Sequence, residues 1–122
     1  MAARGEPRGR RVAVATQERP AGCCPHLHEA VELVGKRWTG AIVYVLLEHR
    51  QPMRFTQIGQ AIPDLSDRLL SERMKELEAR GIVRRRVHPE APVRVEYELT
   101  SAGRELAPAL RELRRWALRH LE

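Results

Sequence analysis

Apolar residues recur every three or four positions in several segments of the chain, which is the spacing of amphipathic helices. The first such segment starts at Cys24-Pro25 and stops at Gly35. Proline favours a first helical turn, because the N–H that it lacks would be unpaired there. The second segment runs from about Arg37 to Glu48 and is apolar over much of its circumference. A helix of that kind is predicted to lie at the centre of the fold.

The most regular of the predicted helices extends from Ser66 to about Arg80. The Ser66 hydroxyl can cap its first turn, and Gly81 can adopt the left-handed conformation that ends a helix. One side of this helix is apolar and is formed by Leu69, Leu70, Met74 and Leu77. The opposite side carries polar or small residues, namely Arg68, Ser71, Glu72, Lys75 and Ala79. Such a side is either solvated or inserted in a groove of DNA, and the helix alone does not decide between the two.

A shorter helix, capped by Thr56, is predicted over residues 57–61, after an extended piece at residues 53–55. Pro63 forces the residue before it out of helical geometry, so a turn separates this helix from the one that begins at Ser66. Two helices joined by a tight turn, the second better formed than the first, make a helix-turn-helix.

After Gly81 the apolar period changes from 3.6 residues to 2, which predicts two β-strands, over residues 82–87 and 93–99. Two prolines stiffen the tip between them, His88 to Pro92. Arginines 84–86 alternate in the first strand, so two of them are expected to share a face. In the second strand one face is apolar: Val93, Val95, Tyr97 and Leu99. A hairpin directly after a candidate recognition helix is a wing. The predicted fold is therefore a winged helix-turn-helix, mostly α with a small β-hairpin (α+β).

A last helix, capped by Thr100, is predicted to run to about His120, with a kink or a frayed first turn at Pro108. Its apolar residues step by four and three, as in a seam between helices: Leu106, Leu110, Leu113, Ala117 and His120/Leu121. Little core remains for a helix after the wing, so we expect this seam and Trp116 to pack on a second copy of the chain. The alternative is contact with the first helix of the same chain.

The composition of the 122 residues, 43% hydrophobic and 31% charged, favours one compact domain. We place it at residues 23–122, after a flexible basic tail at residues 1–22 that has no sustained periodicity. Residues 1–24 carry about half of the formal net charge of +6. The surplus in the domain is mild, so overall charge is weak support for nucleic-acid binding, and the placement of the charges matters more.

The chain shows no apolar run near the roughly 20 residues that span a bilayer and no secretion signal. We therefore expect a cytoplasmic protein with no membrane partner. The adjacent Cys23 and Cys24 are poorly placed for a disulfide, which agrees with a reducing compartment. Cys24 lies at a helix N-terminus, where the helix dipole favours the reactive thiolate. It is either a redox sensor or a half-buried interface cysteine.

The sequence predicts no metal site, no other cofactor and no catalytic activity. Cys24 and His28 share a helical face, but no second pair of ligands lies at a suitable spacing. The sequence has no glycine-rich phosphate loop, no nucleophile elbow and no His-Glu-x-x-His run. The protein is therefore predicted not to be an enzyme.

Six motifs in combination identify a family. They are Cys24-Pro25, Gly35 to Thr39, Arg54-Phe55, Ser66 to Gly81, Pro92 to Tyr97 and Leu99 to Gly103. Together they resemble the HxlR family of bacterial transcription regulators, which are winged-helix proteins related to the MarR group. The similarity covers about Cys24 to His120. Cys23 and the arginine-rich tail depart from the shared pattern.

The resemblance implies a homodimer that binds operator DNA near promoters, more often as a repressor than as an activator. It implies that the first and last helices form the dimer interface, and we assign to it Leu27, Val31, Leu106, Leu110, Leu113, Trp116, Ala117 and Leu121. Some members of the family use the cysteine that opens the first helix to sense oxidants or electrophiles, which here is Cys24. A small-molecule or oxidant effector is therefore a candidate partner.

The expected DNA contacts come from three places. Base edges in the major groove would meet Ser66, Arg68, Ser71, Glu72 and Lys75. Phosphates would meet Arg54, Thr56 and Gln57 at the start of the preceding helix. His88 and Arg94 flank the wing and would reach the backbone or the minor groove. Arg73 and Arg80 are expected instead to pair with Glu76 and its neighbours. The competing function is a protein-interaction adaptor, which would lack a steep salt-dependent affinity for duplex DNA.

Overall fold

The computed structural model describes Gly22 and residues 24–122, which form two compact units, one ending at Val34 and the other comprising Gly35–Glu122. Apart from Gly22, the predicted tail lies outside the described residues, as does Cys23. The first unit contains α1 (Pro25–Val34), which agrees with the predicted first helix. None of the side chains of α1 is buried, and its apolar residues Leu27 and Val31 are exposed.

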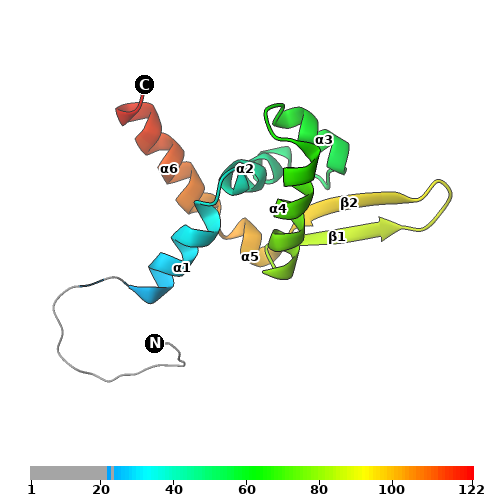
Figure 1. Ribbon diagram of the computed structural model, residues 1–122, viewed down its shortest axis with the longest axis horizontal. Helices are drawn as coiled ribbons and strands as arrows, with labels where there is room; N and C mark the ends of the chain where they lie inside the picture. Colours follow the sequence, from blue (N-terminus) through cyan, green and yellow to red (C-terminus); the bar gives the residue numbers. More distant parts are fainter. Residues whose placement is uncertain (1–21, 23) are drawn as a thin grey trace, which may run out of the picture. The chain divides into compact units, whose positions relative to one another are not determined.

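The core of the second unit is built around α2 (Thr39–His49), confirming the prediction of a central helix (Figure 1). Four of its apolar side chains are buried: Ile42, Val43, Leu46 and Leu47. The helices α3 (Phe55–Ala61) and α4 (Asp67–Ala79) complete the helix-turn-helix and add their own apolar sides to this core. Those sides comprise Ile58, Leu70, Met74 and Leu77.

The ends of α4 are as predicted. The Ser66 Oγ accepts a hydrogen bond from the Leu69 N–H at 3.2 Å, which caps the first turn. Gly81 has a φ of 76°, the left-handed conformation that follows a helix. The start of α3 is different, because the helix begins at Phe55 and Thr56 is not its cap. Instead, the Gln57 Oε1 accepts from the backbone N–H of Arg54 at 2.8 Å. A glutamine in the first turn of the helix thus satisfies the backbone N–H of the residue that precedes the helix.

The strands β1 (Val83–His88) and β2 (Arg94–Leu99) pair in antiparallel register, with Val83 opposite Leu99 and His88 opposite Arg94. Each strand starts one residue later than predicted. His88 thus belongs to a strand and not to the tip. Val93 lies outside β2 and is 65% exposed, so it is not part of the buried apolar face.

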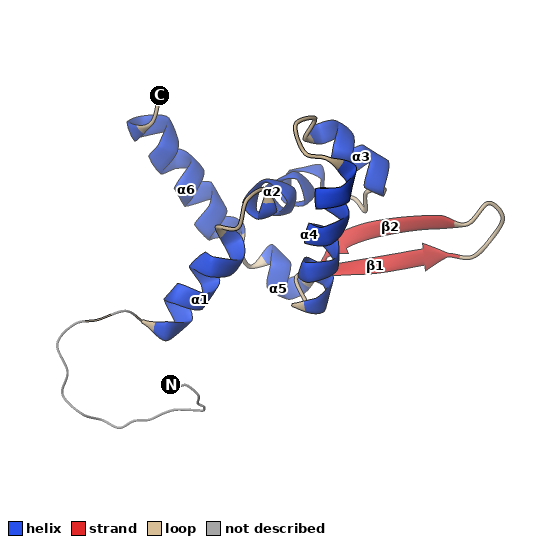
Figure 2. Cartoon of the chain, viewed as in Figure 1, coloured by secondary structure: helices blue, strands red, loops and turns tan. Residues whose placement is uncertain are grey.

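The predicted extended piece before α3 anchors the hairpin. Met53 and Tyr97 exchange two backbone hydrogen bonds, of 2.9 and 2.8 Å, so the backbone of Met53 continues the sheet on the other side of β2. Figure 2 shows the hairpin projecting away from the helices of this unit. The unit is a winged helix-turn-helix, mostly helical with a two-stranded antiparallel hairpin.

The single last helix that was predicted is two helices, α5 (Ser101–Arg104) and α6 (Ala107–His120). Thr100 caps α5 as expected, through a 3.2 Å bond from the Gly103 N–H to its Oγ1. Pro108 lies in the first turn of α6. Proline suits that turn but lacks the N–H that would continue a preceding helix, so the break falls just before it. No helix in the described part of the chain is both long and apolar enough to cross a membrane.

Candidate nucleic-acid interface

The polar side of α4 faces outward. Its apolar residues Leu70, Met74 and Leu77 are buried, whereas the side chain of Arg68 is 90% exposed. Glu72 and Lys75 are exposed too, and Ser71 is half-buried. The Arg68 Nε lies 3.6 Å from the Glu72 Oε2, one helical turn away, so the two side chains form an exposed i,i+4 ion pair. The predicted major-groove residues are therefore available on one surface.

This surface is not uniformly basic. Its cations are Arg68 and Lys75, while Asp67, Glu72 and Glu78 are exposed on the same helix. A helix with this balance gains little from long-range attraction to phosphates. Its contribution to binding would lie in selective hydrogen bonds to base edges, and attraction would come from elsewhere in the unit.

The start of α3 is one place in this unit that could attract phosphates. Arg54, Thr56 and Gln57, the residues predicted to contact phosphates, are all exposed. The Gln57 Oε1 accepts from the Arg54 N–H, and its amide NH₂ is the group that could donate to a phosphate. Arg54 also lines a shallow hollow together with the tip of the hairpin, residues 90–95. The structure thus brings Arg54 and Arg94 to one hollow, a proximity that the sequence does not reveal.

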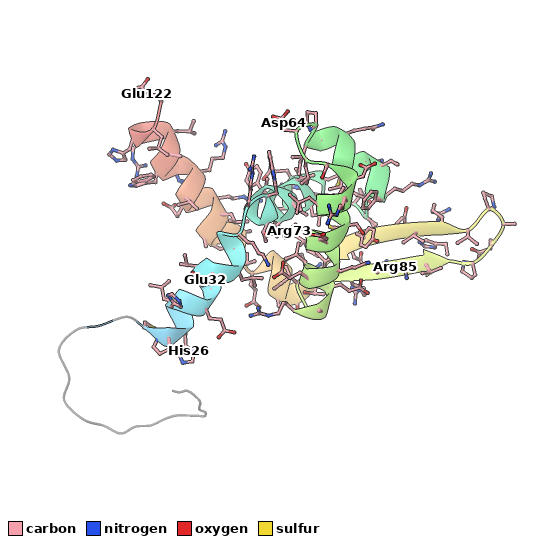
Figure 3. All side chains as sticks on the ribbon, in the orientation of Figure 1. His26, Glu32, Asp64, Arg73, Arg85 and Glu122 are labelled. Atoms are coloured by element: carbon pink, nitrogen blue, oxygen red, sulfur yellow. The ribbon has the colours of Figure 1, made fainter. Side chains whose placement is uncertain are left out.

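One face of the hairpin is a row of ion pairs. Arg84 and Arg86 share Glu98, with Nη2 to Oε2 at 2.9 Å and Nη1 to Oε2 at 3.4 Å. This confirms that two of the three arginines lie on one face. Arg85 pairs with Tyr97 in the strand register and alternates with Arg84 and Arg86, so it lies on the other face of β1 (Figure 3 labels Arg85).

Glu96 holds the two residues of the hairpin that were predicted to contact DNA. Its Oε1 lies 2.9 Å from the His88 Nε2 and its Oε2 lies 3.5 Å from the Arg94 Nε. Sequence reasoning missed the role of Glu96 and Glu98. The signal was present, since the two glutamates alternate with the apolar residues of β2 and so lie on its charged face.

The predicted partner of Arg73 is wrong. The Arg73 Nε donates to the backbone carbonyl of Arg37 at 2.9 Å, and Glu76 is occupied by the Nζ of Lys36 at 3.0 Å (Figure 3 labels Arg73 on α4). Both partners belong to the turn before α2, and spacing along α4 could not indicate them. The pairing expected for Arg80 stays a prediction.

The predicted interface residues divide into three groups by burial. Leu110 is buried in the core of its own chain, which removes it from a contact with a second copy. Leu106 and Ala117 are half-buried. The remaining predicted residues, on α1 and near or beyond the middle of α6, are exposed: Leu27, Val31, Leu113, Trp116 and Leu121. The ring of Trp116 lies against that of His120, with centroids 5.4 Å apart.

Cys24, the candidate sensor, is exposed at the residue before α1. Its backbone carbonyl accepts from the His28 N–H at 2.9 Å, the first hydrogen bond of the helix. Among the described residues, no group of three or more histidine, cysteine, aspartate or glutamate side chains is arranged to hold a metal ion.

Comparison with known proteins gives consistent matches. The family described as HxlR-like helix-turn-helix matches residues 33–122. The chain is 52% identical over 94 residues to the Bacillus subtilis (strain 168) protein named "Uncharacterized HTH-type transcriptional regulator YvaP", covering 77% of this chain and 85% of that protein. The structure of the reduced form of the transcriptional regulator YodB from B. subtilis aligns with a TM-score of 0.74 and 44% identity, covering 83% of this chain and 97% of that one. Quinone-bound YodB aligns with a TM-score of 0.68 and 40% identity, covering 80% and 99%.

Proposed function

This chain belongs to the HxlR-like helix-turn-helix family, whose matching relatives are transcriptional regulators, and we propose that it represses transcription by binding a palindromic operator as a homodimer. The outward polar side of α4, beside the projecting hairpin, is the observation that carries this proposal. In the proposed complex, α4 enters the major groove, which admits a helix and presents a distinct pattern of hydrogen-bond donors and acceptors at each base pair. The start of α3 and the hairpin then contact phosphates or the minor groove.

The homodimer is supported by exposed apolar side chains on α1 and α6. Large apolar residues there have little cover within a single chain: Leu27, Val31, Leu113, Trp116, Leu118 and Leu121. Exposed apolar surface of this kind is typical of a contact between subunits. A two-fold dimer would present two copies of α4 to one duplex, with half-sites about 10 bp or a multiple of that apart.

We also propose that Cys24 senses electrophiles or oxidants. The relative YodB has been solved in a reduced and in a quinone-bound form, and Cys24 is exposed on this chain. The Cys24 thiolate would add to a ring carbon of the quinone, forming a C–S bond, and the quinone oxygen would take up a proton. A small-molecule or oxidant effector would in this way alter the affinity for DNA.

Selection from a library of randomised DNA duplexes tests the central proposal. The protein should enrich a palindromic sequence, protect it in a footprint as paired half-sites, and lose affinity steeply as salt concentration rises. A protein-interaction adaptor would enrich no sequence and show no steep salt dependence. That result would overturn the proposal.

A further inference from the structure

Two polar contacts tie the middle of α4 to the turn before α2. The Arg73 Nε donates to the Arg37 carbonyl at 2.9 Å, and the Lys36 Nζ lies 3.0 Å from the Glu76 Oε2. Arg73 and Glu76 are three residues apart, so both project from the same flank of α4. Neither contact belongs to the predicted DNA surface.

The turn that receives these contacts is itself well defined. The Lys36 carbonyl accepts from the Thr39 N–H at 2.9 Å, which closes a four-residue turn onto the first residue of α2. Trp38 has a φ of 74°, a left-handed conformation that its surroundings must maintain in a residue other than glycine. The Arg37 guanidinium lies 5.2 Å from the centre of the Trp38 ring. Thr39, which follows, is buried. The turn is therefore a well-ordered attachment site at the start of the central helix.

The flank of α4 is the place where such contacts have most effect on its rotation. Burial of Leu70, Met74 and Leu77 fixes which side of the helix meets the core. The hydrophobic driving force is itself non-directional, so directional contacts at the flank add to the definition of the helix's orientation. A hydrogen bond and an ion pair at the side of the helix are directional. Recognition groups must be held within about 0.5 Å and 10–20° of their working geometry. The two flank contacts supply a constraint of that kind for Arg68 and Lys75.

We propose that Lys36, Arg73 and Glu76 are positioning residues for DNA recognition, which set the orientation of α4 by fastening its flank to the turn before α2. They act on sequence discrimination through α4 and not by touching DNA. The inference rests on the proposed function of α4 in the major groove.

Glu76→Gln gives the sharpest test, because the two possible effects have opposite signs. Loss of a carboxylate near DNA, acting through charge alone, would raise affinity for every duplex. Loss of a positioning contact lowers affinity for the duplex selected from the randomised library and leaves affinity for a scrambled duplex of the same composition unchanged or higher. We expect the ratio of the two affinities to fall about fivefold, since half-exposed ion pairs are weak and each dimer contains two.

Lys36→Met separates positioning from a direct phosphate contact. A lysine bound to phosphate would, when removed, weaken both duplexes alike and reduce the salt slope by about 1. We expect instead a loss confined to the selected duplex with an unchanged slope. Lys36→Glu alone should lower the ratio of affinities for the selected and the scrambled duplex. The double variant Lys36→Glu with Glu76→Lys, which exchanges the two charges, should restore part of that ratio.

Glu48→Gln is the matched control. Glu48 pairs with Arg111 at 3.4 Å between α2 and α6, and the two side chains are 50% and 44% exposed, close to the 30% and 45% of Glu76 and Lys36. This control should leave the ratio unchanged, and thermal unfolding should show that every variant is folded.

The inference is overturned if Glu76→Gln keeps the ratio or raises affinity for both duplexes equally, or if Lys36→Met lowers the salt slope. Arg68→Ala distinguishes the two levels of failure. If it lowers affinity for the selected duplex while Glu76→Gln does not, only the positioning role fails. If the unchanged protein selects no duplex, the proposed function fails and the inference fails with it.

Discussion

His88 and Glu96 face each other across the hairpin, with the imidazole Nε2 2.9 Å from the carboxylate Oε1. The same carboxylate lies 3.5 Å from the Arg94 Nε. A single glutamate therefore offsets the positive charge at the place where the hairpin is proposed to meet DNA. This arrangement limits the attraction of the hairpin for phosphates, whatever the base sequence.

Glu96→Gln should consequently raise affinity for DNA without regard to sequence. The amide no longer neutralises Arg94 or repels phosphate, so a scrambled duplex should bind more tightly and with a steeper salt dependence. Titration of that duplex at several salt concentrations measures both effects. Glu48→Gln is the control, because it removes the same charge from α2, outside the hairpin. An equal gain in that control would show that only net charge had changed.

Arg68→Ala and Lys75→Ala should weaken binding to the selected duplex. Both side chains lie on the exposed side of α4, and loss of a base contact costs about 1–3 kcal/mol of binding free energy. If a residue contacts a base, substitution should also relax the preference at one position of the half-site. Equilibrium titration of single-base variants of the duplex measures this. Arg111→Ala is the control, and unaltered affinity in both test variants would refute the placement of α4.

The helix-turn-helix and the hairpin were predictable because their signals are local. The Ser66 hydroxyl, the apolar period and Gly81 lie within or next to α4, and a period of 2 residues marks the strands directly. For the last helix, the disturbance predicted at Pro108 is found as the break before α6, but the prediction of one continuous helix was wrong, for a local reason as well. Pro108 is compatible with the first turn of a helix, and a continuous apolar seam does not show that a new helix starts there.

The partners of charged residues were not predictable in the same way. Arg73 meets a carbonyl 36 residues away in the chain, and Glu76 meets a lysine 40 residues away. Rules based on helical spacing identify neighbours three or four positions apart, such as Arg68 and Glu72, and indicate nothing about the turn before α2. The hollow shared by Arg54 and the hairpin tip depends on the same long-range placement.

Gly103→Ala should destabilise the protein. A Cβ at Gly103 would collide with the backbone carbonyl oxygen of Ile82, which cannot move as a side chain can, and we expect a loss of about 1–3 kcal/mol in the free energy of unfolding. Urea denaturation measures it. Gly59→Ala is the matched control in α3, since its Cβ would meet Asp67 and Leu70 at an ordinary 3.8 Å. That substitution should be neutral or stabilise by about 0.4–1 kcal/mol. A similar loss in both variants would contradict the argument from Ile82.

Cys24→Ser should abolish a response to quinone. In the unchanged protein, benzoquinone is expected to increase the mass by one adduct and to change affinity for the selected duplex, because Cys24 is exposed. The serine hydroxyl is a far weaker nucleophile than a thiolate, so neither change should occur in the variant. Intact-mass spectrometry and DNA titration follow the two effects. Cys23→Ser keeps Cys24 and should respond as before; loss of the response there instead would assign the sensor to the neighbouring cysteine.

Leu113→Arg should shift the protein from dimer to monomer. Leu113, a member of the apolar seam of α6, and Trp116 beside it are 59% and 47% exposed in the single chain. A charge placed in an apolar contact between subunits must be desolvated without a partner, which opposes association. Sedimentation equilibrium measures the dimer dissociation constant. Glu112→Arg introduces the same side chain one residue earlier and about 100° around the helix, so it should leave association nearly intact. A Leu113 variant that stays dimeric at the concentrations where the unchanged protein does would show that α6 is not the contact surface, and the pairing of two α4 helices on one duplex would need another interface.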